Sequence, residues 1–377
     1  QWLDTNLHLL PYLVFGVGLV LCWLFYNSRE FNLFIILAVS FGVLSQFFWI
    51  KGLAGFQREI LFNLICILIP LNFLIFNYLK ERGILNQYGI RRLLFVVLQI
   101  IAAFWLVKTN QLGISTYLSM DVFLHPLQGK TIIRQSGQMM MGLSLVVLST
   151  HWLIRPNQLL GAWILALISL IVALHFVLNT QLATVYFMIS GIILVSAIII
   201  NSYNLAYKDE LTQMSSRRAL KQELASLGKT YTLAMVDVDH FKKLNDNYGH
   251  DVGDEVLKML ATYLQSVEGG GKAFRYGGEE FTIVFAGKDA SNAAVYLDAL
   301  RNKIASKPFI VRNKKRPKDK PGQKPKKSEN IQKLAVTVSI GVAENQAKHK
   351  STQDIMKSAD NALYKAKKKG RNRVEIE

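Results

Sequence analysis

Apolar residues dominate the first 206 positions of the chain, in long runs that short polar segments separate. A membrane-spanning helix needs about 20 predominantly apolar residues. Seven runs meet this requirement approximately, at 7–26, 31–50, 59–79, 90–107, 138–154, 159–178 and 182–203. The pattern therefore predicts an α-helical transmembrane bundle of about seven spans. Six spans are the alternative, because the fourth and fifth runs are the shortest.

The pattern changes after residue 206, where apolar runs become short and helical periodicities appear between them. We expect strands at 233–238 and 336–342, a hairpin over 272–286, and a closing strand at 373–377. Apolar residues at helical spacing predict helices over 251–266, 290–306 and 352–369. This order predicts an α/β domain with a mixed sheet, close to the ferredoxin-like split βαβ arrangement, with helices on one face.

Charge separates the same two parts of the chain. Residues 1–206 carry 11 Lys/Arg and 5 Asp/Glu, and residues 207–377 carry the remaining 33 and 21 of the 44 and 26 in the whole sequence. Soluble domains are about one quarter charged. We therefore predict a transmembrane domain over 1–206 and a cytosolic domain over 207–377. The two cysteines, Cys22 and Cys66, exclude a disulfide framework and a cysteine-based zinc site.

The loop over 80–92 carries four basic residues, which favours a cytoplasmic position. This predicts a multi-pass protein of the inner (plasma) membrane, with the N-terminus outside and the C-terminal domain in the cytoplasm. No acidic or basic residue lies deep in a predicted span, which argues against a transporter. His8, His151 and His175 lie in or beside the spans. We interpret them as hydrogen-bonded histidines, with ligation of haem or metal as the alternative.

Carboxylates gather where the predicted strands of the second domain end. Asp237 and Asp239 close a buried strand, and Glu279 and Glu280 follow a Gly-Gly turn on the hairpin. Like-charge repulsion destabilises such a cluster unless a hard cation such as Mg²⁺ (or Mn²⁺) binds it, and Mg²⁺ in proteins commonly accompanies phosphates. Gly277 and Gly278 would let the backbone approach a phosphate. The cations available to hold a polyphosphate are Lys242, Lys367 and Arg371.

The motifs over 207–377 resemble the GGDEF family of diguanylate cyclases. The signature stands here as Gly277-Gly278-Glu279-Glu280-Phe281. Three further stretches match in order: DELTQMSSRRAL at 209–220, DVDHFKKLNDNYGHDVGDEVL at 237–257, and VTVSIGVA at 336–343 with ALYKAKKKGRNRV at 362–374. Met214 and Ser216 depart from the family pattern. Four motifs in order are a specific signal, whereas the signature alone would be weak.

The resemblance implies a role for each matching residue. Asp237, the carbonyl of Val238 and Glu279 would hold the metal, with Glu280 as a second candidate, and Glu279 is the candidate base for the attacking 3′-hydroxyl. The residues expected to bind GTP are Lys242, Asn245, His250, Asp254, Gly277, Gly278, Lys367 and Arg371. Among them Asn245 and Asp254 would read guanine, because a carboxylate accepts from its adjacent N1–H and N2–H donors.

The family reaction condenses two GTP into cyclic di-GMP and two pyrophosphates, so two domains must face each other in a homodimer. We expect the membrane domain to sense an unidentified ligand and to control that geometry. The alternative from another class is a catalytically silent receptor that binds GTP or cyclic di-GMP. No central motif residue is degenerate, which favours the enzyme.

Two features depart from the family. The positions of the family's R-x-x-D product-inhibition site hold Glu268 and Gly271, which predicts weak feedback inhibition. A basic insertion at 312–333 carries ten Lys/Arg against two acidic residues, and prolines recur every four positions in it. We expect a solvated loop, with contact to anionic lipid as the alternative. No nucleic-acid partner is expected, because aromatic residues do not interleave the basic ones.

Overall fold

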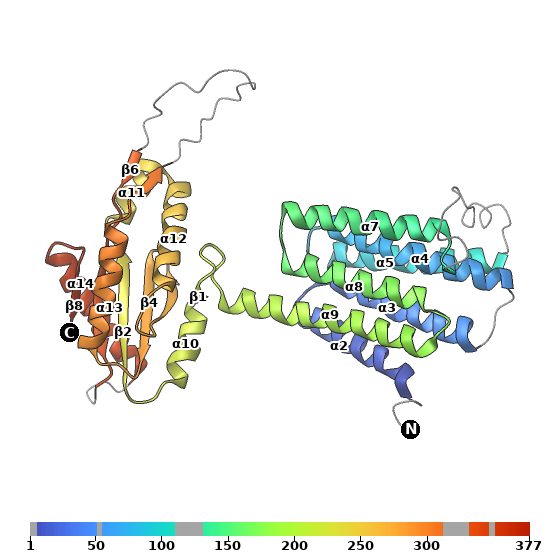
Figure 1. Cartoon of the computed structure of the whole chain (residues 1–377), viewed down its shortest axis with the longest axis horizontal. Coiled ribbons are helices and arrows are strands. Elements are labelled where there is room, and N and C mark those ends of the chain that lie inside the picture. Colours follow the sequence, from blue (N-terminus) through green and yellow to red (C-terminus); the bar gives the residue numbers. More distant parts are fainter. Residues whose placement is uncertain (1–5, 51–54, 110–130, 312–331, 347–350) are drawn as a thin grey trace, which may run out of the picture. The chain divides into compact units, whose positions relative to one another are not determined.

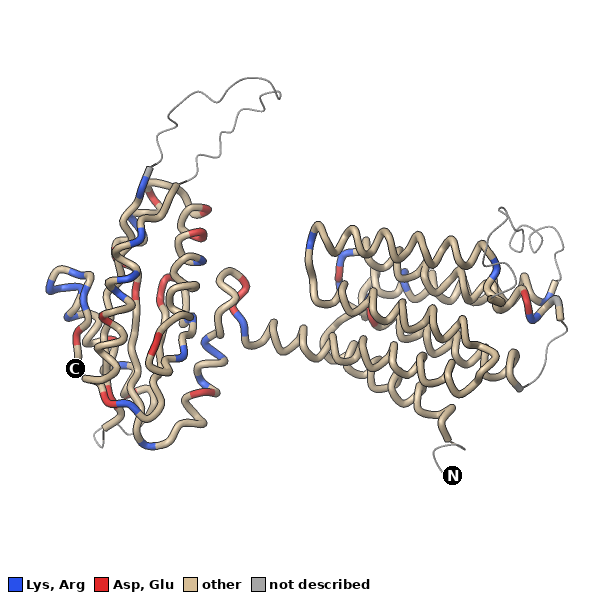
Figure 2. Tube along the Cα trace, in the orientation of Figure 1, with Lys and Arg blue, Asp and Glu red and all other residues tan. Residues whose placement is uncertain are grey.

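The computed structural model describes the chain except residues 1–5, 51–54, 110–130, 312–331 and 347–350. It divides into two compact units, Gln1–Ser202 and Tyr203–Glu377. The division falls inside one helix, α9 (Thr180–Tyr207), close to the predicted boundary at 206/207. Figure 2 shows the difference in charge, since the first unit carries few charged residues, mostly near helix ends, and the second carries many throughout.

The first unit is a bundle of helices, shown in Figure 1 in blue to green. A short 3-10 turn (η1, Leu7–Leu9) and a π-helical segment (η2, Leu44–Ile50) extend two of the helices. The remaining helices before α9 are α2 (Leu10–Leu24), α3 (Ser28–Val43), α4 (Gly55–Tyr78), α5 (Gln87–Thr109), α7 (Gln135–Ile154) and α8 (Gln158–His175). Over the described residues, seven helices are long and apolar enough to cross a membrane, at the positions that the apolar runs predict.

Aromatic and aliphatic side chains fill the interior of the bundle. Phe15, Phe34, Phe41, Phe73 and Phe187 come from four different helices and are all almost completely buried. Other large apolar side chains point outward, such as Leu98, Leu143 and Leu153, each more than half exposed. A helix that is apolar on both its inner and its outer face is typical of membrane spans.

The second unit contains a six-stranded mixed sheet in the order β1-β3-β4-β2-β7-β8. Its strands are β1 (Ser215–Ser216), β2 (Tyr231–Val238), β3 (Lys272–Gly277), β4 (Glu280–Ala286), β7 (Val338–Glu344) and β8 (Val374–Ile376). Its helices are α10 (Arg217–Ser226), α11 (Phe241–Tyr248), α12 (His250–Gln265), α13 (Ala290–Ala305) and α14 (Thr352–Lys368). The central strand β2 runs antiparallel to both of its neighbours, β4 and β7.

Helices cover both faces of this sheet, so the prediction of helices on one face is wrong. Val236 and Ile283 face Leu260 of α12 and Leu297 of α13, in one hydrophobic cluster. On the other face, residues such as Leu233 pack in a second cluster with α10 and α14. The reason is visible in β2, whose eight residues are all buried. A continuous run of this kind indicates a strand covered on both sides.

Several elements were absent from the prediction. These are α10, α11, the two-residue strand β1, and a separate ribbon of β5 (Phe309–Val311) with β6 (Gln332–Leu334). The ribbon brackets the basic insertion. Most of that insertion, 312–331, lies outside the described residues, and its contact with anionic lipid therefore stays a prediction.

Candidate functional site

The carboxylates of the candidate site meet where β2 and the β3–β4 hairpin end. Asp237 is the register partner of Glu280, and Glu280 also pairs with Gly277 across the hairpin. The turn therefore consists of Gly278 and Glu279, and Gly278 has a φ of +46°, a left-handed conformation that glycine adopts without strain. This register brings Asp237, Glu279 and Glu280 together, as the sequence predicted.

Lys367 of α14 lies beside these carboxylates. Its Nζ is 2.8 Å from Oδ1 of Asp237, which is only 5% exposed. Burial raises the pKa of Asp237 above its usual value, and Asp239 and Asp360 raise it further, against the opposing effect of Lys367. Burial is also the largest cause of the raised pKa of Glu279 and of Glu280, followed in both by the charge of Asp237. This cluster of carboxylates and one lysine therefore has an excess of negative charge.

Oxygen donors that repel one another suit a hard divalent cation. Asp237, the Val238 carbonyl and Glu279 offer two carboxylates and one peptide oxygen, the ligands that Mg²⁺ prefers. Among the described residues, no group of three or more His, Cys, Asp or Glu side chains is arranged to hold a metal. Mg²⁺ is usually bound through one or two carboxylates together with phosphates and water, and the donors present fit that arrangement.

Asp239 has a different role from Asp237, although the sequence placed them together. Its carboxylate accepts hydrogen bonds from Thr337 Oγ1 (2.8 Å), Ser339 Oγ (2.6 Å) and the backbone N–H of Asn372 (3.1 Å). These bonds connect the end of β2 to β7 and to the turn before β8. Asp239 is therefore a structural carboxylate with its acceptor sites used.

Asn245 and Gly253 make a close contact between α11 and α12. A Cβ at Gly253 would lie 1.9 Å from Asn245 Oδ1, so glycine is needed for this approach. The same Oδ1 is buried without a hydrogen-bond partner. An unused acceptor fits a role in binding a donor such as a guanine N–H. Asp254 follows Gly253 and is exposed, as is His250 at the start of α12.

The predicted phosphate-binding residues differ in their surroundings. Lys367 lies in the carboxylate cluster. Lys242 is exposed on α11, and Arg371 has a φ of +62° in the turn after α14. The side chains of Lys242 and Arg371 contact no described partner through a hydrogen bond or ion pair. A Cβ at Gly277 or Gly278 would meet no atom within 4 Å, so the space beside the turn is open.

Arg275 holds the turn in place, a role that sequence reasoning missed. Its Nη2 donates to the Gly278 carbonyl at 2.6 Å, and its Nη1 donates to Asp209 Oδ1 at 2.6 Å. Asp209 Oδ1 also accepts from the N–H and hydroxyl of Thr212, and these interactions lower its pKa although burial opposes them. The signal was present, because Asp209 opens a motif that matches the family and Arg275 lies two positions before the signature.

The turn over 268–271 explains one departure from the family. Gly269 and Gly270 have φ values of +70° and +78°. A Cβ at Gly271 would lie 2.8 Å from both Phe285 and Val267. A carboxylate side chain at this position would therefore collide with the core, unless the turn changed.

A mixed sheet that carries carboxylates, a glycine turn and a lysine at one edge is typical of metal-dependent nucleotide enzymes. Residues 206–373 match the sequence model described as "Diguanylate cyclase, GGDEF domain". Through its second unit, the chain belongs to this family.

Named relatives agree with this assignment. Response regulator PleD of Caulobacter vibrioides is 34% identical over 182 residues, which are 46% of this chain and 37% of PleD. Diguanylate cyclase VdcA of Vibrio cholerae is 36% identical over 170 residues, 44% of this chain and 45% of VdcA. The chain thus spans less than half the length of each of these relatives.

A solved structure is also similar. The GGDEF domain of DgcB from Caulobacter crescentus, in complex with cyclic di-GMP, is 34% identical. The match covers 45% of this chain and 93% of that domain, with a TM-score of 0.38.

Proposed function

We propose that this protein is a membrane-bound diguanylate cyclase that condenses two GTP into cyclic di-GMP and two pyrophosphates. The observation that carries the proposal is the cluster of Asp237, Glu279 and Glu280 beside Lys367, on the open glycine turn of a GGDEF domain. One domain offers one such turn, so the reaction needs two copies of the chain that face each other.

In the proposed reaction, the 3′-oxygen of each GTP forms a bond to the α-phosphorus of the other GTP. The bond from that phosphorus to pyrophosphate breaks, and the 3′-hydroxyl loses its proton to Glu279. The raised pKa of Glu279 suits a group that accepts a proton. Asp237, the Val238 carbonyl and Glu279 would hold Mg²⁺ or Mn²⁺, which supplies charge neutralisation at the phosphates.

The remaining residues would position the substrate. Asn245 Oδ1 and Asp254 would accept from guanine, and adenine would leave these acceptors without donors. His250 would lie beside the nucleotide, and Lys242, Lys367 and Arg371 would neutralise the triphosphate. Because such catalysis depends on positioning, the geometry of the dimer is the natural point of control.

We also propose that the helices of the first unit span the cytoplasmic membrane and regulate the cyclase in response to a ligand. Three observations support the span: helix length, mean hydropathy of 1.3 to 2.4 over the seven helices, and large apolar side chains on the outer surface. Substrate GTP requires the second unit to lie in the cytoplasm. Labelling of single cysteines placed in the loops of intact cells would test this topology.

The test of activity is product formation by the detergent-solubilised full-length chain with Mg²⁺ and GTP. We expect cyclic di-GMP from the parent and none from Glu279→Gln. Glu255→Gln is the matched control, because Glu255 is an exposed carboxylate on α12 outside the cluster. The parent could be inactive in this assay because its signal is absent. In that case, fusion of the chain to an inducible dimerisation module should restore its activity. Continued inactivity after forced dimerisation, with GTP still bound, would contradict the proposal and indicate a silent receptor.

A further inference from the structure

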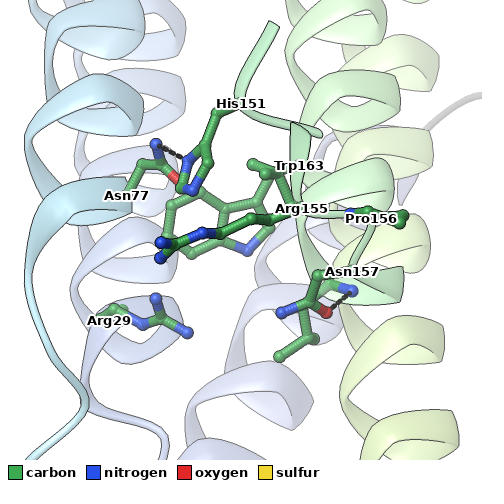
Figure 3. Close-up of a pocket in the computed structure, with 9 residues that line it drawn as sticks. Arg29, Asn77, His151, Arg155, Pro156, Asn157 and Trp163 are labelled. Atoms are coloured by element: carbon green, nitrogen blue, oxygen red, sulfur yellow. Dashed lines mark hydrogen bonds between the residues drawn. The ribbon is translucent and has the colours of Figure 1, made fainter. Parts of the chain in front are cut away.

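A polar pocket lies at one end of the helical unit. Its volume is about 290 Å³, close to the lower end of the range for small-molecule sites, about 300 Å³. Four segments contribute to it: the start of α3, the ends of α4 and α7, and the start of α8 with its preceding loop. Figure 3 shows Arg29, Asn77, His151, Arg155 and Trp163 around this space.

Two guanidinium groups converge on the pocket. Arg29 and Arg155 come from segments more than 120 positions apart in the sequence, and Figure 3 shows both side chains extended towards the same space, across the Trp163 ring. Arg29 Cζ lies 5.5 Å from the centre of that ring, and Trp163 is 2% exposed. Two like charges that line one pocket favour the binding of an anion there.

The neighbouring carboxylates do not neutralise both arginines. Glu81 lies 3.5 Å from Arg29 Nε and 3.9 Å from Arg92 Nη1, and Glu30 lies 3.8 Å from Arg29 Nη2. The carboxylates of Glu30 and Glu81 therefore pair with Arg29 and Arg92. The guanidinium of Arg155 makes no hydrogen bond or ion pair with any described residue, and it remains the unbalanced charge of the pocket.

A buried donor gives a second sign of a ligand. Arg29 Nε is buried and makes no hydrogen bond, although Glu81 Oε2 forms an ion pair with it at 3.5 Å. Asn77 and His151 contact each other through Asn77 Nδ2 and His151 Nδ1 at 2.8 Å, and this contact fixes both side chains on the pocket wall. Leu159 and Leu160 complete the wall with apolar surface.

We propose that this pocket binds a phosphate monoester. Guanidinium groups bind phosphate oxygens in bidentate pairs. A tetrahedral phosphate can meet two such groups from different helices at once, whereas the two oxygens of a carboxylate lie in one plane. The ester group would pack on Trp163 and the two leucines. The same chemistry occurs in a soluble phosphate ester and in the headgroup of phosphatidic acid.

The test compares Arg155→Gln with Arg91→Gln in the full-length chain. Both changes remove one guanidinium near the same end of the bundle, since α4 ends and α5 begins there. Arg91 is exposed and does not line the pocket, so it is the matched control. Any phosphate that binds at the GGDEF unit contributes equally to both variants. The unfolding temperature without ligand should be the same for both, because neither side chain makes a hydrogen bond or ion pair with a described residue.

Binding is measured by calorimetry with glycerol 3-phosphate for protein in detergent, and by the thermal shift that phosphatidic acid causes in phosphatidylcholine nanodiscs. We expect saturable binding of one probe that weakens at least about tenfold in Arg155→Gln and is unchanged in Arg91→Gln. Binding of glycerol 3-phosphate identifies a soluble ligand, and a shift with phosphatidic acid alone identifies a lipid. Absence of saturable binding to both, equal losses in both variants, or tighter binding of succinate would overturn the proposal.

Discussion

The two units of this chain hold polar groups in opposite ways. In the sheet unit, the residues of the candidate site lie in a few recognisable motifs, and strand register brings these motifs together. In the helical unit, the pocket collects single residues from segments far apart in the sequence. Local motifs are therefore sufficient to reveal the first site, whereas only the packing of helices reveals the second.

The units also differ in the sign of the charge that is left unbalanced. The GGDEF unit concentrates Asp237, Glu279 and Glu280 around one lysine. This excess of negative charge favours the binding of a cation. The helical pocket is lined by both Arg29 and Arg155. Their positive charge favours the binding of an anion. In both cases the fold holds like charges together, which is costly unless a ligand compensates, and such places are candidates for function.

The largest effect is expected when Asp237, in β2, and Asp239, just after β2, are substituted one at a time. Asp237→Asn should lower cyclic di-GMP synthesis by at least about 100-fold, because it removes a carboxylate that we propose holds the metal. Its unfolding temperature should not fall, since the charged form of Asp237 is disfavoured in the fold. Asp239→Asn should instead destabilise the unit by about 1–3 kcal/mol through its lost acceptors. Product formation measures the effect on activity, and thermal unfolding measures the effect on stability. Equal effects on both properties in the two variants would contradict this division of roles.

Arg275→Lys should lower the rate by about 10- to 100-fold, as is usual for residues that orient ligands of a metal site. A lysine cannot donate to Asp209 and to the Gly278 carbonyl with the same geometry. The expected loss is in kcat, with little change in GTP affinity. Lys272→Arg on the same strand is the control, because Lys272 pairs with Glu223 away from the turn. Unchanged kcat would exclude a positioning role for Arg275.

Added Mg²⁺ should stabilise the GGDEF unit more at pH 8 than at pH 5. The pKa values of Asp237, Glu279 and Glu280 are raised by folding, so the native state binds more protons than the unfolded state. The contribution of this cluster to stability therefore falls as pH rises from the usual carboxyl range through the raised values. Protons compete with the metal.

At 100 times its dissociation constant, Mg²⁺ contributes about 2.7 kcal/mol. The pH dependence of the shift in unfolding temperature, measured with and without Mg²⁺ for the parent and Glu279→Gln, checks this prediction. A shift of the same size at both pH values would show that the cluster is not the binding site.

A substitution in the helical unit should leave the cyclase domain folded. A Cβ at Gly18 would lie 2.3 Å from the ring of Phe34, so Gly18→Val should cost the bundle about 1–3 kcal/mol through overpacking. Because the two units have separate hydrophobic cores, calorimetry should show one transition shifted and one unchanged. Gly16→Val is the control, since a Cβ at Gly16 meets no atom within 4 Å. A single transition that shifts as a whole would disprove the independence of the cores.

The smallest expected effect is on feedback. Cyclic di-GMP at low micromolar concentration should leave the initial rate of the purified parent unchanged, because Gly271 and the crowded turn around it leave no room for the family's carboxylate. Initial rates measured with increasing product check this. Strong inhibition would show that another surface of the chain binds the product.

Apolar patterning predicted the positions of the helices in the first unit, and the motifs predicted the carboxylate cluster with Lys367. The prediction of helices on one face of the sheet was wrong. The continuous apolar run of β2 indicates a strand that is covered on both sides, and the prediction did not use this signal. The ribbon of β5 and β6 was missed because each strand has three residues, too few for periodicity to show.

Sequence by itself determined which residues of the GGDEF unit are candidates for the site, because they lie in motifs at the ends of strands and in a two-residue turn. Only the tertiary structure decided that Asp239 is structural, that Arg275 supports the turn, and that Arg29 and Arg155 line one pocket. These facts depend on which distant segments pack together. Side-chain contacts between such segments follow from the three-dimensional packing and leave no periodic signal in the sequence.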